Sequence, residues 1–547
     1  MGVLSKNKVN NNNNNNEYSN DYTISGGKYD LSSINPLVEP LPARYEFYKR
    51  LKLFPWWLRY NLGIAKEAVL KDKIIGLGTM MGLQDRWIHR IVRHAVAEFS
   101  KKGLGADYYG YHNIDHELES AYFTLLSANG QENIEKENKF SQDDIKYLFV
   151  AALFHDYDPL KQFDKPHEDS VEWVLRNDDK IKDLIKDVGI NIDIVIAIIH
   201  RTAYPFRGKI AQHAEKRMEE LFNYAGISEN DTNSREHYKE LGWFLSVSER
   251  IAGYALGGID RSMELARTNA HALGWHPSRI SEESVKYFSI LKEEKEMFER
   301  VLYAVPDDYK KNFFDNVAAF KEAWAKEIEV RNSIRRNKIS LTTVTEKVEG
   351  KDGFDPHTKE SVLDIYRKSH RPVGISSEKQ FRKSLDSNDT ILISLRVKDN
   401  NDEISEEIVG YVKGGPLENY QIRHGTHDTN LGKKNTAYME WISIRPGFWG
   451  ETGGHVLRME FLREAKHRGY SYVTSYVHRN VVMQRINKGE NIEIVQKYDP
   501  DKLDYYRVDL NTMTSPISEA VAYNKSETLQ SMDMTNIEID KNYPIID

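Results

Sequence analysis

The chain has 547 residues, a formal net charge of -7 and no cysteine. This length exceeds what one hydrophobic core supports, so a one-domain protein is excluded. The lack of cysteine excludes disulfides, thiolate metal sites and a cysteine nucleophile, which leaves any metal to histidine and carboxylate ligands. The charge gives no clear sign of nucleic acid binding, and no stretch approaches the roughly 20 apolar residues of a membrane helix. A cytoplasmic protein is therefore expected.

The residue pattern divides the chain into four segments. Residues 1–38 contain an asparagine run and no apolar signal-peptide core, which predicts a disordered tail. Residues 39–335 follow helical spacing and predict an all-α domain. Residues 336–515 alternate short β-rich runs with helices and predict an α/β domain. Residues 516–547 are polar and weakly patterned, and are expected to be a C-terminal tail.

The expected elements change in kind near residues 335 to 340. Long helices are expected over Asp143–His155, His237–Ala255 and Pro306–Ile334. Strands are expected over Ile339–Thr345, Thr390–Val397, Ile408–Lys413, Tyr438–Ile444, Tyr472–His478 and Ile492–Tyr498.

The helical segment contains a group of histidines and carboxylates. His112 and His116 are four residues apart, so on a helix both imidazoles would lie on one face and could meet one site. Solvated or core-satisfied histidines are the alternative for this spacing alone. His155 and Asp156 end an apolar helical stripe, where an ionisable pair is costly unless a cation lies against it. A purely structural hydrogen bond between them is the alternative.

These motifs resemble the HD-domain metal-dependent phosphohydrolase superfamily over residues 105–260, and are most similar to its class I cyclic nucleotide phosphodiesterase branch. The resemblance implies that His116, His155 and Asp156 bind a divalent metal, which could be Mg, Mn, Fe or Zn. It also implies that His112 protonates the leaving oxygen. The reaction class would be hydrolysis of a small-molecule phosphoester, with nucleotides among the candidate substrates.

Three further residues are candidate metal ligands. The last family ligand is normally an aspartate, and here Glu249 takes its place or lies one register away from it. Glu249 continues the apolar line of Leu241 and Leu245 at spacing four, so we expect it to face the core. An exposed or arginine-paired glutamate is the alternative. His167 and His200 fall where binuclear HD proteins often add ligands for a second metal.

A second motif lies in the α/β segment. A strand over Ala437–Ile444 is followed by a glycine-containing turn over Arg445–Gly454 and a helix over His455–His467. Glycines at such a turn expose backbone N–H groups to an anion, and the helix dipole adds attraction for a phosphate. An ordinary tight turn is the alternative for these residues alone.

The order of elements resembles the GNAT acyltransferase family over residues 338–510 and implies a mixed central sheet. In that family the loop amides hold the coenzyme A pyrophosphate, strand carbonyls hold the pantetheine arm, and a later asparagine contacts it. The positions so implied for acetyl-CoA are Ile442, Ile444, Trp449, Gly450, Gly453, Gly454 and Asn480.

Three positions depart from the GNAT pattern. Trp449 replaces the usual Arg or Gln, Thr452 replaces a glycine, and Asn487 stands where many members keep a tyrosine that acts as an acid. Coenzyme binding is therefore more secure than catalysis. Glu440 is the expected base, acting directly or through water, and an outward-facing strand glutamate is the alternative.

The leading hypothesis is a bifunctional protein. The HD-type domain would hydrolyse a phosphoester, and the GNAT-type domain would transfer an acetyl group to an amine. One alternative is a GNAT module that binds acyl-CoA without catalysis and controls the hydrolase. Another is a scaffold in which both halves are degenerate.

Overall fold

The protein is described here from a computed structural model. The described residues are 66–101, 111–133, 140–158, 167–273, 275, 279–337, 339–348, 353–368, 378–398, 403–420, 422, 426–440, 442–448, 453–487, 489–498 and 503–512. Both predicted tails, residues 1–38 and 516–547, lie outside this set. None of the helices within it has the length and apolar character needed to cross a membrane.

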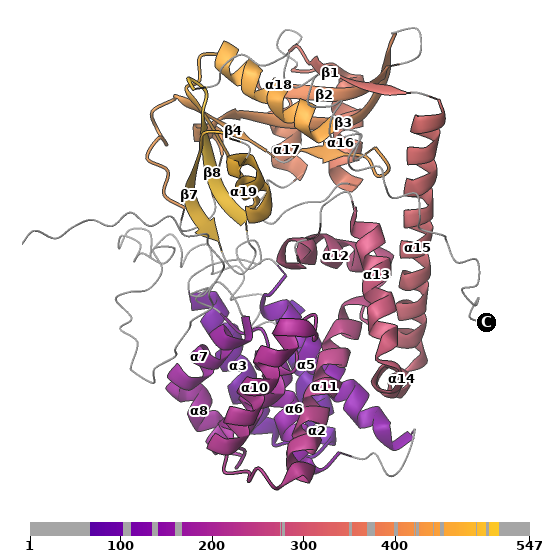
Figure 1. Ribbon diagram of the computed structural model, residues 1–547, viewed down its shortest axis with the longest axis vertical. Helices are drawn as coiled ribbons and strands as arrows, with labels where there is room; N and C mark the ends of the chain where they lie inside the picture. Colours follow the sequence, from indigo (N-terminus) through magenta and orange to yellow (C-terminus); the bar gives the residue numbers. More distant parts are fainter. Residues whose placement is uncertain are drawn as a thin grey trace, which may run out of the picture.

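The first half of the described chain is helical, which confirms the prediction. Its helices form one body beneath the sheet in Figure 1. They are α2 (Lys66–Met80), α3 (Asp85–Lys101), α5 (Ile114–Asn129), α6 (Gln142–Phe154), α7 (His167–Asn177), α8 (Asp179–Lys186), α9 (Ile192–His200), α10 (Gly208–Tyr224), α11 (Thr232–Ala255), α12 (Ile259–Leu273), α13 (Ile280–Glu293), α14 (Lys295–Ala304) and α15 (Asp307–Arg336).

Side-chain caps explain where the helices of the candidate site begin. Asn113 caps α5, because its Oδ1 accepts hydrogen bonds from the backbone N–H groups of Asp115 at 2.9 Å and His116 at 3.2 Å. Ser141 and Asp144 form a reciprocal capping box at the start of α6. The caps fix the first turn of α5 and the axis of α6.

Helix α9 lies at the centre of the helical half. Its residues from Ile194 to His200 are buried, and it packs against α6, α10 and α11. A helix that is apolar on all sides has no face suited to contact with water, so it is stable only where other helices surround it. The helices that carry the candidate site residues therefore surround a common apolar core.

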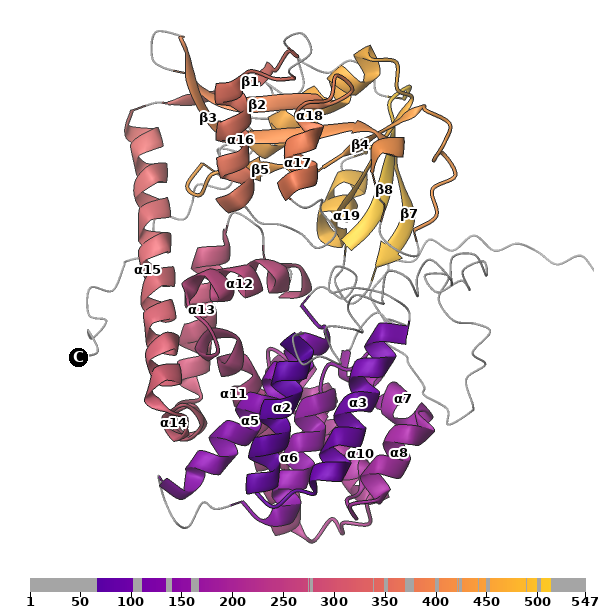
Figure 2. The ribbon, with the colours of Figure 1, turned by 180° about the vertical axis from the view of Figure 1, so that it is seen from behind.

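The long helix α15 runs beside both halves of the molecule (Figures 1 and 2). Near its start, Asn316 Nδ2 donates hydrogen bonds to the backbone oxygens of Tyr254 at 2.7 Å and Gly257 at 2.8 Å. Near its end, Val330 lies against Gly447, where a Cβ atom would come within 2.6 Å of the valine Cβ. Gly447 has a positive φ of 88°, which favours glycine. The end of α11 and the loop after β5 thus contact the same helix.

The second half contains an eight-stranded mixed sheet, as predicted. Its strands are β1 (Ser340–Thr345), β2 (Ile391–Lys398), β3 (Ile404–Pro416), β4 (Thr436–Met439), β5 (Ser443–Ile444), β6 (Tyr472–His478), β7 (Ile492–Tyr498) and β8 (Leu503–Asp509). The order is β1-β2-β3-β4-β6-β8-β7, with β5 pairing with β3. Strands β4 and β6 are parallel, and the other pairs are antiparallel.

Helices cover both faces of this sheet (Figures 1 and 2). Helices α18 (Gly453–His467) and α19 (Arg479–Asn487) lie on one face, and α16 (Pro356–Lys368) and α17 (Glu378–Ser384) on the other. The side chains of β2 alternate between the two faces of the sheet. Ile391, Ile393 and Leu395 pack in the core with α18, whereas Leu392 packs in the core with α16 and α17.

One strand prediction was wrong, and one strand was missed. The single strand expected over Ala437–Ile444 is divided into β4 and β5, because the chain leaves its parallel partner after Tyr438. Strand β8 was not predicted. Asp504 and Arg507 interrupt its apolar pattern, but both are buried, and Arg507 forms an ion pair with Asp428 at 2.5 Å.

Candidate functional site

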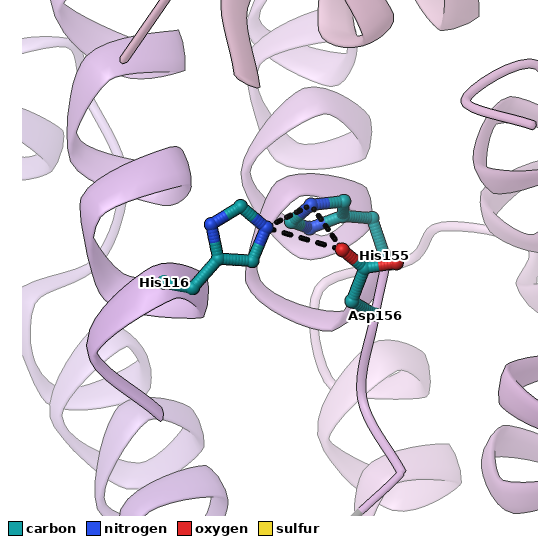
Figure 3. Close-up of side chains that lie close together, drawn as sticks. All are labelled: His116, His155 and Asp156. Carbon is teal, nitrogen blue, oxygen red and sulfur yellow. Dashed lines mark hydrogen bonds and ion pairs between the residues drawn. The ribbon is translucent and has the colours of Figure 1, made fainter. Parts of the chain in front are cut away.

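Three predicted metal ligands meet at the ends of α5 and α6 (Figure 3). His116 comes from the first turn of α5, His155 is the C-terminal cap of α6, and Asp156 follows it. His116 Nε2 lies 3.1 Å from His155 Nε2 and 3.1 Å from Asp156 Oδ2. The third side of this triangle, from His155 Nε2 to Asp156 Oδ2, is 3.2 Å.

The spacing of these atoms suits a divalent cation. Ligands at about 2.1 Å from an ion lie about 3.0 Å apart in an octahedral shell and about 3.4 Å apart in a tetrahedral one. The observed separations of 3.1 to 3.2 Å fall between these values. Imidazole and carboxylate donors suit zinc, iron or manganese. Within the described part of the chain, this is the one group of three or more such donors close enough to share an ion.

The surroundings of His155 direct its lone pair toward the cluster. Its Nδ1 lies 2.9 Å from the backbone oxygen of Ala152 and 3.3 Å from Glu117 Oε2. Both neighbours are acceptors, so Nδ1 carries the proton and Nε2 presents its lone pair. Glu117 was not identified from the sequence. It is wholly buried beside a candidate ligand, and its position directly after His116 was the available signal.

The electrostatics of the cluster are strongly coupled. Burial opposes ionisation of Asp156, but the charges of His155 and His112 outweigh it and hold the pKa of Asp156 well below its usual value. Burial also lowers the pKa of His155, and the neighbouring Asp156 and Glu117 outweigh this and raise it. Burial raises the pKa of Glu117. The carboxylates of the cluster thus favour a positive charge beside them, which is the charge a cation would supply.

The expected helical pairing of His112 with His116 was wrong, because Asn113 starts the helix and His112 lies before it. His112 nevertheless reaches the cluster, with Nε2 3.5 Å from Asp156 Oδ2. Its predicted role as a proton donor requires this proximity to the ligands. The approach is made by the turn before α5 and not by a shared helix face.

Glu249 on α11 lies near the cluster but is not one of its three ligand atoms. It retains some exposure, and burial raises its pKa to about 7. The charges of His155 and His116 act on it in the opposite direction, which places its carboxylate in their neighbourhood. Asp260, the next carboxylate along the chain after Glu249, is exposed in the first turn of α12. Glu249 therefore remains the candidate for a further ligand.

Of the two histidines expected at a second metal, only the side chain of His200 is described, and it is not one of the three clustered ligands. His200 is buried and its Nε2 lies 3.2 Å from Glu172 Oε2. Glu172 also accepts hydrogen bonds from Arg176 Nε at 2.7 Å and Arg217 Nε at 2.9 Å. No pattern in the sequence indicated that two arginines would already engage the partner of His200. His167 begins α7, and its side chain lies outside the described residues.

The parallel strands β4 and β6 separate at the place where the acyl-CoA site was expected. Strands β4 and β6 pair over three positions and end with Tyr438 opposite Thr474. Beyond this point β5 pairs with Gly410 and Tyr411 of β3, whereas β6 continues beside β8. Among the described strands, no ladder joins β5 to β6. The sheet therefore opens between them.

The implied coenzyme positions lie around this opening where they are described. Ile444 is buried beneath α18, and Ile442 is partly buried. Helix α18 begins at Gly453 and has no acidic residue in its first turn. A Cβ atom at Gly453 would come within 2.6 Å of Leu395 Cδ2, so this glycine permits close packing on β2. Gly454 follows and is partly exposed.

Three other coenzyme positions lie wholly or partly outside the described residues. Trp449 and Gly450 lie outside the described residues. Asn480 lies in α19, but its side chain is outside them.

Glu440, the expected base, lies directly after β4 and is buried in an ion pair with Lys413 Nζ. Lys413 Nζ also donates to Ser384 Oγ at 2.7 Å and lies 4.5 Å from the centre of the Phe381 ring. Because Ser384 and Phe381 belong to α17, Glu440 lies on the sheet face opposite α18. The lysine compensates the cost of burying the carboxylate, and it must give up this contact if the carboxylate is to accept a proton.

No family model matches the chain, and no curated protein was found to match it. Solved structures resemble part of it. Protein yncA from Salmonella typhimurium, with its cofactor acetyl-CoA, is 12% identical over 33% of this chain and 99% of its own, with a TM-score of 0.23. A GNAT family N-acetyltransferase from Escherichia coli in complex with CoA is 11% identical over 31% and 82%, with a TM-score of 0.21. The GNAT domain of S. lividans PAT is 12% identical over 31% and 90%, with a TM-score of 0.22. These values do not define a family for this chain.

Proposed function

We propose that the sheet-containing half binds acetyl-CoA and transfers its acetyl group to an amine, as a GNAT-type acyltransferase. The main support is the opening between β5 and β6, because it frees strand backbone groups that an extended pantetheine arm could pair with. The start of α18 lies after this opening, and the positive end of its helix dipole attracts a pyrophosphate. The sequence order that resembles the GNAT family agrees with both features.

In the proposed reaction, the amine nitrogen attacks the thioester carbonyl, a C–N bond forms, the C–S bond breaks, and coenzyme A leaves as a thiolate, which becomes the thiol by taking up, directly or through water, the proton that Glu440 has received from the nitrogen. Glu440 takes the proton lost by the nitrogen, directly or through water, as Lys413 moves from the carboxylate to solvent or acceptor. The acceptor would approach from the face that α17 covers, because Glu440 lies on that face. A module that binds acetyl-CoA without transfer is the competing function.

Substitutions at Gly454 test the coenzyme site. Gly454→Glu places a negative charge in the first turn of α18, where it suits the helix but repels a pyrophosphate. Gly454→Gln is the matched neutral control. In calorimetric titrations with acetyl-CoA, we expect wild type and Gly454→Gln to bind alike and Gly454→Glu to bind about tenfold or more weakly. Equal binding by all three refutes the assigned position. Transfer from labelled acetyl-CoA to a panel of amines then separates the enzyme from the sensor.

We also propose that the helical half is a metal-dependent phosphohydrolase of the HD type. The observation that supports it is the triangle of His116, His155 and Asp156 with the His155 lone pair directed into it. A divalent ion held there would supply positive charge to a phosphoryl group and to an attacking water. His112, next to Asp156, could donate a proton to the leaving oxygen.

Metal content gives the direct test of this second function. Purified wild type should contain at least one divalent ion per chain, and His155→Ala and Asp156→Ala should each remove it. His213→Ala is the control, because this histidine of α10 is half exposed and pairs with Asp169 outside the cluster. Hydrolysis of bis(p-nitrophenyl) phosphate should follow metal content across the series. Full metal content in both cluster variants would refute the centre.

A further inference from the structure

We propose that Arg201, with Phe206 and Trp243 beside it, forms a binding site for a phosphate group next to the candidate metal centre. The site would hold a second phosphate of the substrate or the phosphate product. Its link to hydrolysis rests on the metal-dependent function proposed above, whereas anion binding at Arg201 does not.

The first observation is that the charge of Arg201 is not compensated by a close partner. Arg201 follows α9, and its Nη1 is buried and has no hydrogen-bond partner among the described residues. Burial lowers the pKa of Arg201 to about 10. A buried guanidinium nitrogen without an acceptor is costly, and proteins usually satisfy such groups. An oxyanion is the ligand that satisfies both the charge and the donor.

The second observation is that the guanidinium is held in place by packing. Its Cζ lies 3.7 Å from the centre of the Phe206 ring and 5.9 Å from that of Trp243. A Cβ atom at Gly242 would come within 2.6 Å of Arg201 Cβ, so the arginine stem lies directly on α11 at a glycine. The side chain is therefore preorganised by stacking and packing contacts that do not occupy its N–H groups.

The third observation concerns the neighbouring charges. Glu294 and Glu215 are the carboxylates whose charges act on Arg201, and Arg250 adds a like charge. Glu294 is already engaged, by Arg250 Nη1 at 2.6 Å and by Trp243 Nε1 at 2.6 Å, and Glu215 is exposed. Glu294 is thus occupied by Arg250 and Trp243, and its carboxylate is not a hydrogen-bond partner of the Arg201 guanidinium among the described residues.

The site and Glu249, the candidate further ligand, share helix α11, because Arg201 packs on Gly242 of the same helix. Arg250 is buried directly after Glu249, and the charges of His116 and His155 act on that glutamate. Tyr204, which precedes Phe206 in the same loop, lies under the Arg250 guanidinium at 5.8 Å. A substrate whose reacting phosphate lies at the metal could thus extend a second phosphate toward Arg201.

Binding to metal-free protein separates this site from the metal centre. After the metal is removed on a chelating resin, we would titrate inorganic phosphate and phenyl phosphate and follow binding by calorimetry and Trp fluorescence. We expect Arg201→Met to weaken binding of both probes about tenfold or more. Gly242→Ala should weaken it as well, because its new methyl group displaces the arginine stem. Arg207→Met is the matched control, since Arg207 is exposed six residues further along, and it should change binding less than about twofold.

Thermal unfolding shows whether each variant is folded, so that a loss of structure is not mistaken for a loss of binding. Because Arg201→Met removes a buried uncompensated charge, it should fold at least as stably as wild type, and phosphate should stabilise wild type but not the variant. Tighter binding of phenyl phosphate than of phosphate identifies an ester ligand, whereas equal binding identifies free phosphate. Undiminished binding in Arg201→Met, or no phosphate binding by wild type, overturns the proposal. If phosphate binds through Arg201 but His155→Ala does not alter metal content, the anion site stands and the proposed metal centre fails.

Discussion

Replacing Glu117 by glutamine should weaken metal binding without touching a ligand. Glu117 is wholly buried, and its Oε2 lies 3.3 Å from Nδ1 of His155, the nitrogen that faces away from the cluster. A carboxylate at this position makes the imidazole a stronger donor to a cation and fixes its ring. Glu117→Gln keeps the shape of the side chain and removes its charge.

The size of the effect follows from the geometry around His155 Nδ1. Outer-shell partners of metal-binding histidines contribute about 10- to 100-fold in metal affinity. The Glu117 contact of 3.3 Å is longer than the 2.7 to 2.9 Å typical of charge-assisted bonds, and the Ala152 oxygen at 2.9 Å remains after the substitution. We therefore expect the lower end of this range, about tenfold, which corresponds to about 1.4 kcal/mol.

Competition titration of apo protein with Zn²⁺ and a coloured chelator measures this affinity. Glu119→Gln is the control, since Glu119 lies two residues further along α5 and contacts Arg261 at 3.4 Å. Glu117→Asp should give an intermediate affinity, because its shorter side chain retains the charge at a greater distance. Affinities of Glu117→Gln and Glu119→Gln that both equal wild type would refute the reasoning about His155.

Three further predictions follow from buried carboxylates. Glu249→Gln should weaken metal binding more than Glu117→Gln and less than Asp156→Ala in the same titration, and unchanged affinity would place the further ligand elsewhere. Glu172→Gln should reduce the free energy of unfolding by about 3 to 5 kcal/mol at pH 7, measured with urea, because it leaves Arg176 and Arg217 without their buried partner. Hydrogen bonds from His200, Arg217 and Arg176 outweigh burial and hold the pKa of Glu172 below its usual value, so its contribution is present above about pH 4.5 and is lost as pH falls through the folded-state pKa. A difference between wild type and variant that does not narrow in acid would contradict this. Glu440→Gln should slow acetyl transfer about 100-fold with acetyl-CoA binding retained, and an unchanged rate excludes Glu440 as the base.

The ligand triangle could be predicted because its parts are local in sequence. His155 and Asp156 are adjacent, and an apolar stripe marks the helix that buries them. The partner His116 was found through the family spacing, although the expected helical pairing with His112 was wrong. Glu117 was missed because a glutamate in an unaligned helix reads as a solvated residue. Only the packing of α5 on α6 turns it toward His155.

The parts that sequence could not supply depend on contacts between distant elements. An unbroken β-rich run gave no sign that the chain would leave β6 after Tyr438, since the partner of a strand is not encoded in the strand itself. Strand β8 was missed because Asp504 and Arg507 interrupt its apolar pattern. The charge of Arg507 is compensated by Asp428, which lies 79 residues away in the sequence. The contact of His200 with Glu172 was also not predicted, because it forms only where α7 packs against α9.

The contact between α15 and Gly447 has a practical consequence for dividing the protein. A fragment that starts at Ser340, where the sheet begins, would lose Val330 and expose the loop that precedes α18. A fragment that starts at Asp307 keeps this support, but α15 then carries Asn316 without the Tyr254 and Gly257 carbonyl groups that it caps at the end of α11. The helix belongs to both halves, so an expression boundary at either of its ends removes contacts from one of them. Shortened versions meant for coenzyme-binding assays should therefore retain α15 and replace its N-terminal apolar contacts with polar residues.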